Sequence, residues 1–393
     1  MIWTLFLFAA SFSADFPGGS GRAEWVRPDY LRLHVEGEAD QDGRNRQANW
    51  YYFRLDDVKG EELTIELTDL VGEYNYQAGT HGVTENTHPV YSYDNRTWRH
   101  FAETEWNEEA VELRLRLTPE QETLWIAHVP PYTLGNLKKL EAEALEHPHF
   151  QEKSVGRTAD SREMPLWTIT DAASPDDQKK CVWLMFRQHS WESGSSWAGD
   201  GAVRFLLSDS PIAERMRREV VWKIFPMADP DGVERGGVRF NKYGYDLNRN
   251  WDAVDPAKTP EIAAQRRAAA DWLASGRSID LFLTLHNTET SEYLEGPAEF
   301  HDLTARFRRN LVENTTFAPT RAEPRDATTS TTPGRPGRMT VNQDLHADFG
   351  VPAMIMEQMI GRNPKLEGFP TAEDRREFGA GLVQAAWRTV VEQ

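Results

Sequence analysis

Strongly apolar runs alternate with helical segments in the chain from about residue 132 onward. The runs "LWTIT", "CVWLMF", "VVWKIFPM", "DLFLTL" and "AMIMEQM" are apolar at consecutive positions rather than at alternate ones. Such runs are typical of strands that are buried on both faces. The segments between them, such as "PEIAAQRRAAADWLAS" and "HDLTARFRRNLVENT", have helical composition. This order predicts an α/β domain over residues 132–393, in which helices cover both faces of a sheet.

Residues 15–131 have a different hydrophobic pattern. The runs "YLRLHV", "NWYYFRL", "ELTIEL", "VELRLRL" and "TLWIAHV" are short, and several alternate apolar and polar residues with period two. Gly, Asp and Asn separate them, and helical spacing is absent. We therefore expect an N-terminal antiparallel β-sandwich. A length of 393 residues also exceeds that of one ordinary core, which agrees with two domains.

Charge and cysteine content exclude several classes of function. The chain has 44 basic and 62 acidic residues, a net charge of −18. That charge repels nucleic acid and anionic membrane surfaces, so we expect neither as a partner. The single cysteine, Cys181, excludes an internal disulfide and a cysteine-rich metal site. Because Cys181 lies in an apolar run, we expect a buried, inert thiol, and any metal must be held by His, Asp or Glu.

The N-terminus resembles a short secretory signal. Residues 2–10 form an apolar run, and the small residues of the segment 11–14 follow it, although no Lys or Arg precedes the run. We interpret residues 1–14 as a signal peptide, which predicts a secreted or periplasmic protein. The alternative is a hydrophobic first strand of a cytoplasmic protein. The run is too short for a transmembrane helix.

Two polar residues follow one of the predicted buried strands. In "RQHSWESGSSW", His189 and Glu192 lie three residues apart, directly after "CVWLMF", and His286 ends the strand "LFLTLH". Ligands of α/β sheets bind at the carboxyl ends of strands. A catalytic zinc uses three protein ligands and one open position. The His189–Glu192 pair alone fits a hydrogen-bonded structural pair better than a metal site. The third residue at a strand end makes a metal site an equal alternative.

Two further features point to peptide chemistry. Asn248 and Arg249 are adjacent in "GYDLNRNW", and an Arg can grip a carboxylate through two parallel hydrogen bonds. Taken alone, they also fit a loop with a surface Arg. Glu357 lies inside the apolar run "AMIMEQM", where a carboxylate is costly and needs a partner or a task. Beside a metal-bound water it would act as a general base.

The order His-x-x-Glu, Asn-Arg, His, Glu resembles that of the zinc metallocarboxypeptidases. The resemblance is closest to the cytosolic carboxypeptidase branch, whose best-known members trim glutamates from protein tails. It runs from "FRQHSWESGSSWAGDGAVRFLLS" to "GYDLNRNW". At the N-terminus, "NWYYFRL", "PVYSYDNRTWRHF" and "TLWIAHVPPYTLGNL" resemble the β-sandwich that precedes the catalytic domain in that branch. The resemblance implies a carboxypeptidase-like α/β domain with a mixed central sheet flanked by helices.

The resemblance also implies roles for individual residues. One zinc ion would be held by His189, Glu192 and His286. Arg239 would polarise the scissile carbonyl, and Glu357 would be the base. The substrate's terminal carboxylate would be anchored by Asn248 and Arg249. Arg338, in an Arg-rich loop over residues 318–338, matches a basic residue that favours glutamate side chains.

The chain departs from the family pattern at two places. The usual His-Pro-Gly-Glu is His-Ser-Trp-Glu, and the usual Leu-His-Gly-His is "LHNTET". These changes leave the metal ligands in place and leave the substrate open. We expect a zinc carboxypeptidase acting on peptides or protein C-terminal tails, with a possible preference for acidic residues. The alternatives are a zinc amidohydrolase of the deacylase type, which the N-terminal sandwich disfavours, and a catalytically silent binding protein, which the complete residue set disfavours.

Overall fold

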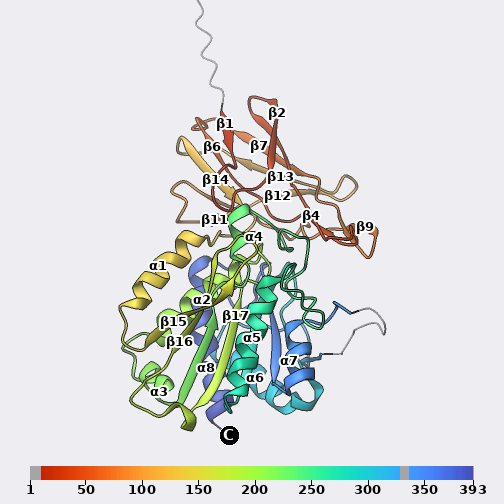
Figure 1. The fold of residues 1–393 in the computed structure, drawn as a ribbon. Helices are drawn as coiled ribbons and strands as arrows, with labels where there is room; N and C mark the ends of the chain where they lie inside the picture. The colour runs from red at the N-terminus through yellow and green to blue at the C-terminus, as the bar shows by residue number, and fades with distance from the viewer. Residues whose placement is uncertain (1–9, 328–335, 393) are drawn as a thin grey trace, which may run out of the picture. The chain divides into compact units, whose positions relative to one another are not determined.

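The computed structural model describes residues 10–327 and 336–392. The chain divides into two units (Figure 1). The first contains the residues up to Pro131 and the short segment Arg235–Val238. The second contains Tyr132–Glu234 and the residues from Arg239 onward.

The first unit is built from β-sheets. One sheet has the order β1 (Ser11–Ser13), β6 (Tyr52–Asp56), β14 (Thr123–Ala127), β10 (Val90–Ser92) and β11 (Arg99–His100). The second has the order β12 (Thr104–Asn107), β13 (Glu112–Leu117), β7 (Leu63–Thr68), β3 (Tyr30–His34) and β2 (Arg22–Arg27). A small sheet contains β4 (Glu38–Ala39), β5 (Arg46–Gln47), β8 (Gly72–Tyr74) and β9 (Gln77–Thr80).

The core of the first unit follows from the alternation in its sequence. In β13, the buried residues Leu113 and Leu115 alternate with Arg114 and Arg116. Inward-facing residues of both five-stranded sheets form one hydrophobic cluster. The prediction of an antiparallel sandwich is confirmed, except that β3 and β7 pair in parallel.

The predicted signal peptide lies only partly within the described residues. Residues 1–9 are outside them. Ser11–Ser13 form β1 and pair with β6, with Ser11 opposite Asp56. In this structure the small residues at the end of the expected signal therefore belong to the sandwich. Within the described ranges, no helix combines the length and the apolar character needed to cross a membrane.

An eight-stranded mixed sheet forms the centre of the second unit. Its order is β15 (Phe150–Arg157), β16 (Glu163–Ile169), β18 (Val220–Phe225), β17 (Lys180–Phe186), β19 (Leu281–Thr288), β22 (Ala353–Met359), β20 (Tyr293–Gly296) and β21 (Arg325–Asp326). The four strands β18, β17, β19 and β22 run parallel. Antiparallel pairs flank them, formed by β16 with β18 and by β20 with β22. The predicted α/β domain with a mixed sheet is confirmed.

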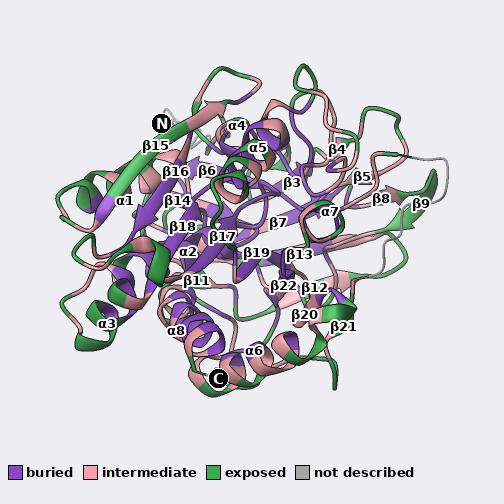
Figure 2. Cartoon of the chain, turned by 60° about the horizontal axis from the view of Figure 1, so that its bottom comes forward, coloured by how far each residue is buried: buried purple, intermediate pink, exposed green. Residues whose placement is uncertain are grey.

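Helices cover both faces of this sheet. One face packs against α1 (Leu134–Leu145), α2 (Ser193–Leu206), α3 (Pro211–Glu219), α6 (His301–Asn314) and α8 (Ala372–Val391). The other packs against α5 (Pro260–Ala274) and α7 (Val341–Phe349). A short helix, α4 (Pro230–Arg235), follows β18. Figure 2 shows the central strands as buried, which explains why their sequences are apolar without alternation.

Glycines allow α2 and α8 to pack closely. A Cβ at Gly379 of α8 would lie 1.8 Å from the carbonyl oxygen of Ala198, and one at Gly201 of α2 would lie 2.0 Å from that of Arg376. The small residues in "GSSWAGDGAV" therefore bring the two backbones together. This contact fixes the position of α2. The predicted metal ligand Glu192 directly precedes the first turn of that helix.

Candidate metal centre and active site

The turn between β17 and α2 presents His189 and Glu192. β17 ends at Phe186, and Arg187 adopts a left-handed conformation with φ 61°. The buried Arg187 side chain donates from Nε and Nη2 to the carbonyl oxygen of Ser190, at 2.9 and 2.6 Å. Glu192 occupies the N-cap position of α2. The turn is thus held from within by one buried guanidinium.

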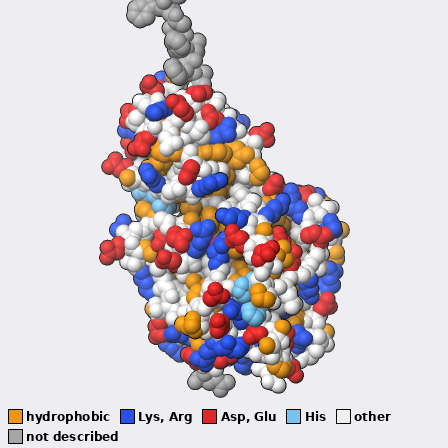
Figure 3. Space-filling model, turned by 90° about the vertical axis from the view of Figure 1, so that its left-hand side faces the viewer, with side chains coloured by type: hydrophobic (Ala, Val, Ile, Leu, Met, Phe, Trp, Pro, Cys, Tyr) orange, Lys and Arg blue, Asp and Glu red, His pale blue; other side chains and the backbone are white. Residues whose placement is uncertain are grey.

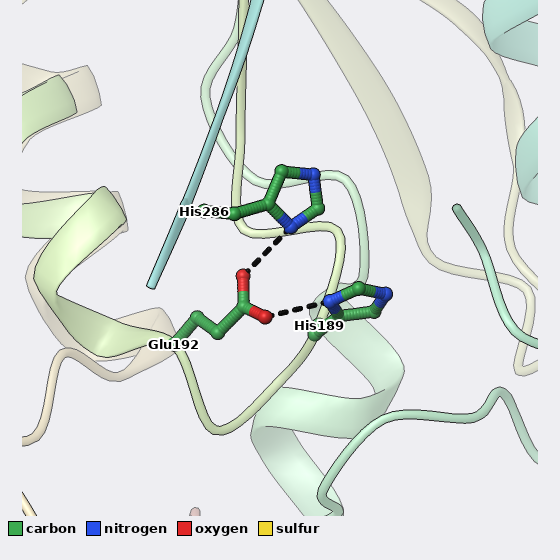
Figure 4. Close-up of side chains that lie close together, drawn as sticks. All are labelled: His189, Glu192 and His286. Atoms are coloured by element: carbon green, nitrogen blue, oxygen red, sulfur yellow. Dashed lines mark hydrogen bonds and ion pairs between the residues drawn. The ribbon is translucent and has the colours of Figure 1, made fainter. Parts of the chain in front are cut away.

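The three predicted metal ligands converge, as Figure 4 shows. His189 Nδ1 lies 2.6 Å from Glu192 Oε1, and His286 Nδ1 lies 2.9 Å from Glu192 Oε2. All three residues are buried, and one ligand atom from each lies within 4.8 Å of the others. Two imidazoles and one carboxylate are a ligand set of catalytic zinc sites.

The second nitrogen of each imidazole faces an acceptor. His189 Nε2 lies 3.1 Å from Asp246 Oδ1, and His286 Nε2 lies 3.0 Å from Gln188 Oε1. The Asp246 carboxylate favours the tautomer of His189 that carries the proton on Nε2 and leaves Nδ1 free to bind a metal. The donor set and its outer partners therefore fit a zinc ion.

Asp246 and Gln188 were not predicted as site residues. Asp246 lies two residues before Asn248 in "GYDLNRNW", so a search for carboxylates near the other site residues would have found it. Gln188 precedes His189 and is fully buried. Its amide is fixed by donation from Nε2 to the carbonyl oxygen of Leu247, at 3.0 Å. The sequence contains no signal for that contact.

Asp246 links the metal site to Arg239. Arg239 Nε donates to Asp246 Oδ2 at 2.7 Å, while Oδ1 of the same carboxylate faces His189. Burial alone would raise the pKa of Asp246, but the charges of Arg239 and His189 hold it well below its usual range. Asp246 is thus an anion that orients both an imidazole and a guanidinium.

Glu357 lies beside His286. The two residues are register partners on β22 and β19. Within the described part of the chain, Glu357 Oε2 has no hydrogen-bond partner. Burial raises the pKa of Glu357 to about 8, and the charge of Glu192 raises it too, against the opposing effects of His286 and Arg239. Glu357 as a whole is half-buried, and a carboxyl group whose pKa lies near neutrality suits a general base.

Asn248 and Arg249 lie in the same loop as Asp246. Asn248 Oδ1 accepts from the Val341 amide at 3.2 Å, and its Nδ2 lies 3.3 Å from His286 Nε2. Arg249 is partly exposed, and its Nη1 donates to the carbonyl oxygen of Asn248 at 2.7 Å. The structure therefore places Asn248 next to the ligand His286, and Arg249 against the backbone of Asn248.

Arg338 belongs to a loop that is tied to the segment after Arg249. The amides of Gly337 and Met339 donate to the Asp252 carboxylate, both at 3.0 Å. Residues 328–335 of the same loop lie outside the described residues. The described contacts place the backbone of Arg338 near this segment and assign no role to its side chain.

Cys181 takes no part in the site. It is a free, buried cysteine, and burial raises the pKa of its thiol to about 12. The prediction of an inert thiol is confirmed.

Known proteins resemble both units. Residues 137–294 match the family model described as zinc carboxypeptidase, and residues 12–129 match the cytosolic carboxypeptidase N-terminal domain. Mouse cytosolic carboxypeptidase 3 is 26% identical over 266 residues, which cover 62% of this chain and 26% of the relative. Human cytosolic carboxypeptidase 6 is 30% identical over 181 residues, covering 44% and 35%. The chain thus spans well under two thirds of the length of these relatives.

A solved structure shares the fold. The metallo-carboxypeptidase from Burkholderia cenocepacia superposes with a TM-score of 0.83 at 23% identity, covering 97% of this chain and 99% of the other. The two family matches and the convergence of His189, Glu192 and His286 lead to one conclusion. The chain belongs to the zinc metallocarboxypeptidase family, in the branch that carries a cytosolic carboxypeptidase N-terminal domain.

Proposed function

We propose that this chain is a zinc-dependent carboxypeptidase that hydrolyses the last peptide bond of a peptide or protein tail, with one zinc ion per chain. The observation that carries the proposal is the buried cluster of His189, Glu192 and His286, with Glu357 beside His286 in the sheet register. The family matches support the same reaction class.

Each site residue would have its own role in the reaction. Zinc held by the three ligands would supply a water molecule whose pKa is lowered to about 7. Glu357 Oε2 is free to hold the proton of the attacking water and to pass it to the leaving amine. Arg239, oriented by Asp246, would donate to the carbonyl oxygen as negative charge develops there. Arg249 would bind the terminal carboxylate.

The direct test compares a peptide that has a free C-terminus with the same peptide carrying a C-terminal amide. Wild type should release the terminal amino acid from the free peptide and leave the amide intact, because the amide removes the charge that Arg249 binds. One zinc per chain should be found by elemental analysis. An N-acyl amino acid tests the deacylase alternative. Cleavage of that compound without cleavage of the peptide would replace the proposal.

The preferred terminal residue is a separate proposal. Support for an acidic residue comes from two guanidinium groups near the catalytic strand. Those of Arg325 and Arg321 lie 5.1 and 5.7 Å from the ring centroid of Tyr293, which is the register partner of Glu357. Glu295 pairs with Arg325 at 3.4 Å and partly compensates its charge. Arg338 is a further candidate cation.

Peptides that differ only in a terminal Glu, Leu or Lys test this preference. With an acidic preference, Glu295→Gln should raise the Glu-to-Leu ratio of kcat/KM, because it frees Arg325. If wild type instead releases Lys fastest, and Glu295→Gln loses this preference, Glu295 selects a basic side chain. Comparison of Arg338→Gln with Arg325→Gln would identify the cation used.

We also propose export of the protein to a secreted or periplasmic location. Support comes from the apolar run of residues 2–10 and the small residues after it. On the face drawn in Figure 3, acidic and basic side chains are interspersed, without a large patch of one sign. N-terminal sequencing of protein from separated cell fractions tests the location. An intact N-terminus in the cytoplasmic fraction would contradict it.

A further inference from the structure

Lys223 is a charged residue in the middle of a buried strand. All six residues of β18, "VVWKIF", are buried, and Lys223 is 9% exposed. Its register partners are Thr168 on β16 and Trp183 on β17. A lysine is rarely buried without a partner, because its ammonium group loses hydration. This position therefore needs an explanation that the carboxypeptidase site does not supply.

The described partners of the Lys223 ammonium group are a hydroxyl group and an aromatic ring. Lys223 Nζ donates to Thr168 Oγ1 at 2.8 Å and lies 4.6 Å from the ring centroid of Trp272. No carboxylate of the described residues lies within 4.0 Å of Nζ. Burial lowers the pKa of Lys223 to about 8, and the charges of Lys153 and Arg277 lower it too, against the opposing effect of the Asp176 charge. Lys223 is thus a desolvated ammonium group that forms no direct ion pair among the described residues.

A cavity of about 350 Å³ opens at this ammonium group. Lys153 and Arg277 line it together with Lys223, and the half-buried Trp272 forms an aromatic wall, whereas Trp183 behind it is fully buried. The guanidinium of Arg277 lies 4.4 Å from the ring centroid of Trp272. The volume is at the lower end of the range for small-molecule sites.

The acidic residues of the same cavity restrict the ligand. Glu152 and Asp271 also line it, so a dianion such as phosphate would face two carboxylates. Glu152 Oε2 accepts from the indole nitrogen of Trp167 at 2.6 Å. The exposed apolar surface of the cavity comes mainly from Trp272, because Leu166 and Ala268 are themselves buried. One negative charge on an apolar, preferably planar, body satisfies these conditions best.

We propose that this cavity binds a small organic monocarboxylate, whose carboxylate accepts a hydrogen bond from Lys223 and whose apolar part packs against Trp272. The cavity contains none of the residues assigned above to the metal centre. It is therefore a second binding site, and the proposal does not depend on the reaction catalysed at the first.

Benzoate is the probe, and benzamide and inorganic phosphate are its controls. Benzamide keeps the ring without the charge, and phosphate keeps the oxyanion without the ring. The metal-loaded full chain is titrated by calorimetry, and binding at this cavity is followed through the ¹⁵N–¹H signal of the Trp272 indole, identified with Trp272→Phe. Benzoate should shift this signal, whereas benzamide and phosphate should not.

Lys223→Met keeps the length and apolar stem of the side chain and removes the charge. It should weaken benzoate binding at this site by at least about tenfold, the loss expected for one charge-assisted hydrogen bond. Arg249→Met removes the carboxylate anchor of the metal site and should leave the Trp272 shift unchanged. Arg277→Met, on a half-exposed side chain, should weaken binding more modestly and serves as a second variant if Lys223→Met folds poorly.

Three results would overturn the proposal. The first is the absence of a Trp272 shift in wild type at about 10 mM benzoate, a concentration that detects even millimolar affinity. The second is an equal benzoate affinity in wild type and Lys223→Met with the same Trp272 shift. The third is phosphate binding as tightly as benzoate, which would indicate general attraction of oxyanions to the three cations.

Discussion

Glu357 and His286 are register partners on the adjacent parallel strands β22 and β19. Neighbouring strands lie about 4.8 Å apart, so the sheet itself sets the separation of the candidate base from a metal ligand. The other two ligands come from the turn after β17, which is the strand on the far side of β19. The core of the site therefore rests on three consecutive strands rather than on long loops.

Replacing Glu357 by Gln should abolish turnover without removing the metal. The amide keeps the shape of the side chain but cannot take a proton from water. We expect kcat to fall by at least about 10²-fold, the contribution of a general base. Zinc content by elemental analysis and melting temperature should stay near wild type. Substantial turnover in this variant would assign the base role to another group.

Replacing Asp246 by Asn should weaken metal binding. The Asp246 carboxylate accepts from His189 Nε2 and from Arg239 Nε, and such outer partners raise the basicity of a ligand imidazole. The zinc dissociation constant, measured by competition with a chelating dye, should rise about 10–100-fold. Excess zinc should restore occupancy but not the full rate, because Arg239 loses its charged partner. An unchanged dissociation constant would reduce Asp246 to a structural residue.

Removing the metal should destabilise the second unit. A ligand that binds only the folded state stabilises it by about 4 kcal/mol at a thousandfold excess over its dissociation constant. A chelator should therefore lower the melting temperature of wild type, and added zinc should restore it. His189→Ala should melt at a temperature that responds little to either treatment. Equal responses in the two proteins would place the bound metal elsewhere.

The burial of the Lys223 ammonium group predicts a pH dependence of stability. Its pKa in the folded protein is about 8, below the unfolded value of 10.5. Between these two pH values the unfolded chain binds more protons, so the free energy of unfolding rises with pH. The rise should be up to about 3 kcal/mol and should be absent in Lys223→Met. At pH 7 that variant should melt at a higher temperature than wild type, and a lower one would show that the ammonium group is stabilised.

Because α2 and α8 pack closely, adding one methyl group where they touch should lower the free energy of unfolding markedly. Gly379→Ala places a Cβ against the Ala198 carbonyl and should cost about 1–3 kcal/mol or more. Gly135→Ala is the matched control, because its Cβ would lie in ordinary contact, 3.4 Å from Thr133 Oγ1, inside α1. That change should be neutral or stabilising by about 1 kcal/mol. Urea unfolding of both variants measures the difference, and equal stabilities would show that the helices shift apart freely.

Local sequence patterns predicted the elements that carry the site. The runs around Phe186, His286 and Glu357 are strands, because consecutive apolar residues suit a sheet covered on both faces. The four residues proposed as metal ligands and base could be chosen because they follow or interrupt such runs. The preference for acidic residues inferred from Arg338 had no comparable basis, because a loop position does not define what a side chain contacts.

Other features depend on contacts between distant parts of the chain. Asp246 reaches both His189 and Arg239, and Gln188 reaches His286 across 98 residues of sequence. The parallel pairing of β3 with β7 and the segment Arg235–Val238 in the first unit likewise follow from chain crossings that no local pattern encodes. The same holds for the cavity at Lys223, which residues of β15, β16, β17, β18 and α5 enclose.

The sequence by itself determined which segments are strands or helices and which side chains stand at strand ends, because hydrophobic periodicity and burial are local properties of the chain. Only the tertiary structure decided how those ends meet. The pairing of β17 with β19 and of β19 with β22 brings three ligands and a base together, and it assigns each imidazole its outer partner. The physical reason is that hydrogen bonds between side chains require a few ångströms of proximity, which the fold creates between residues up to about a hundred positions apart.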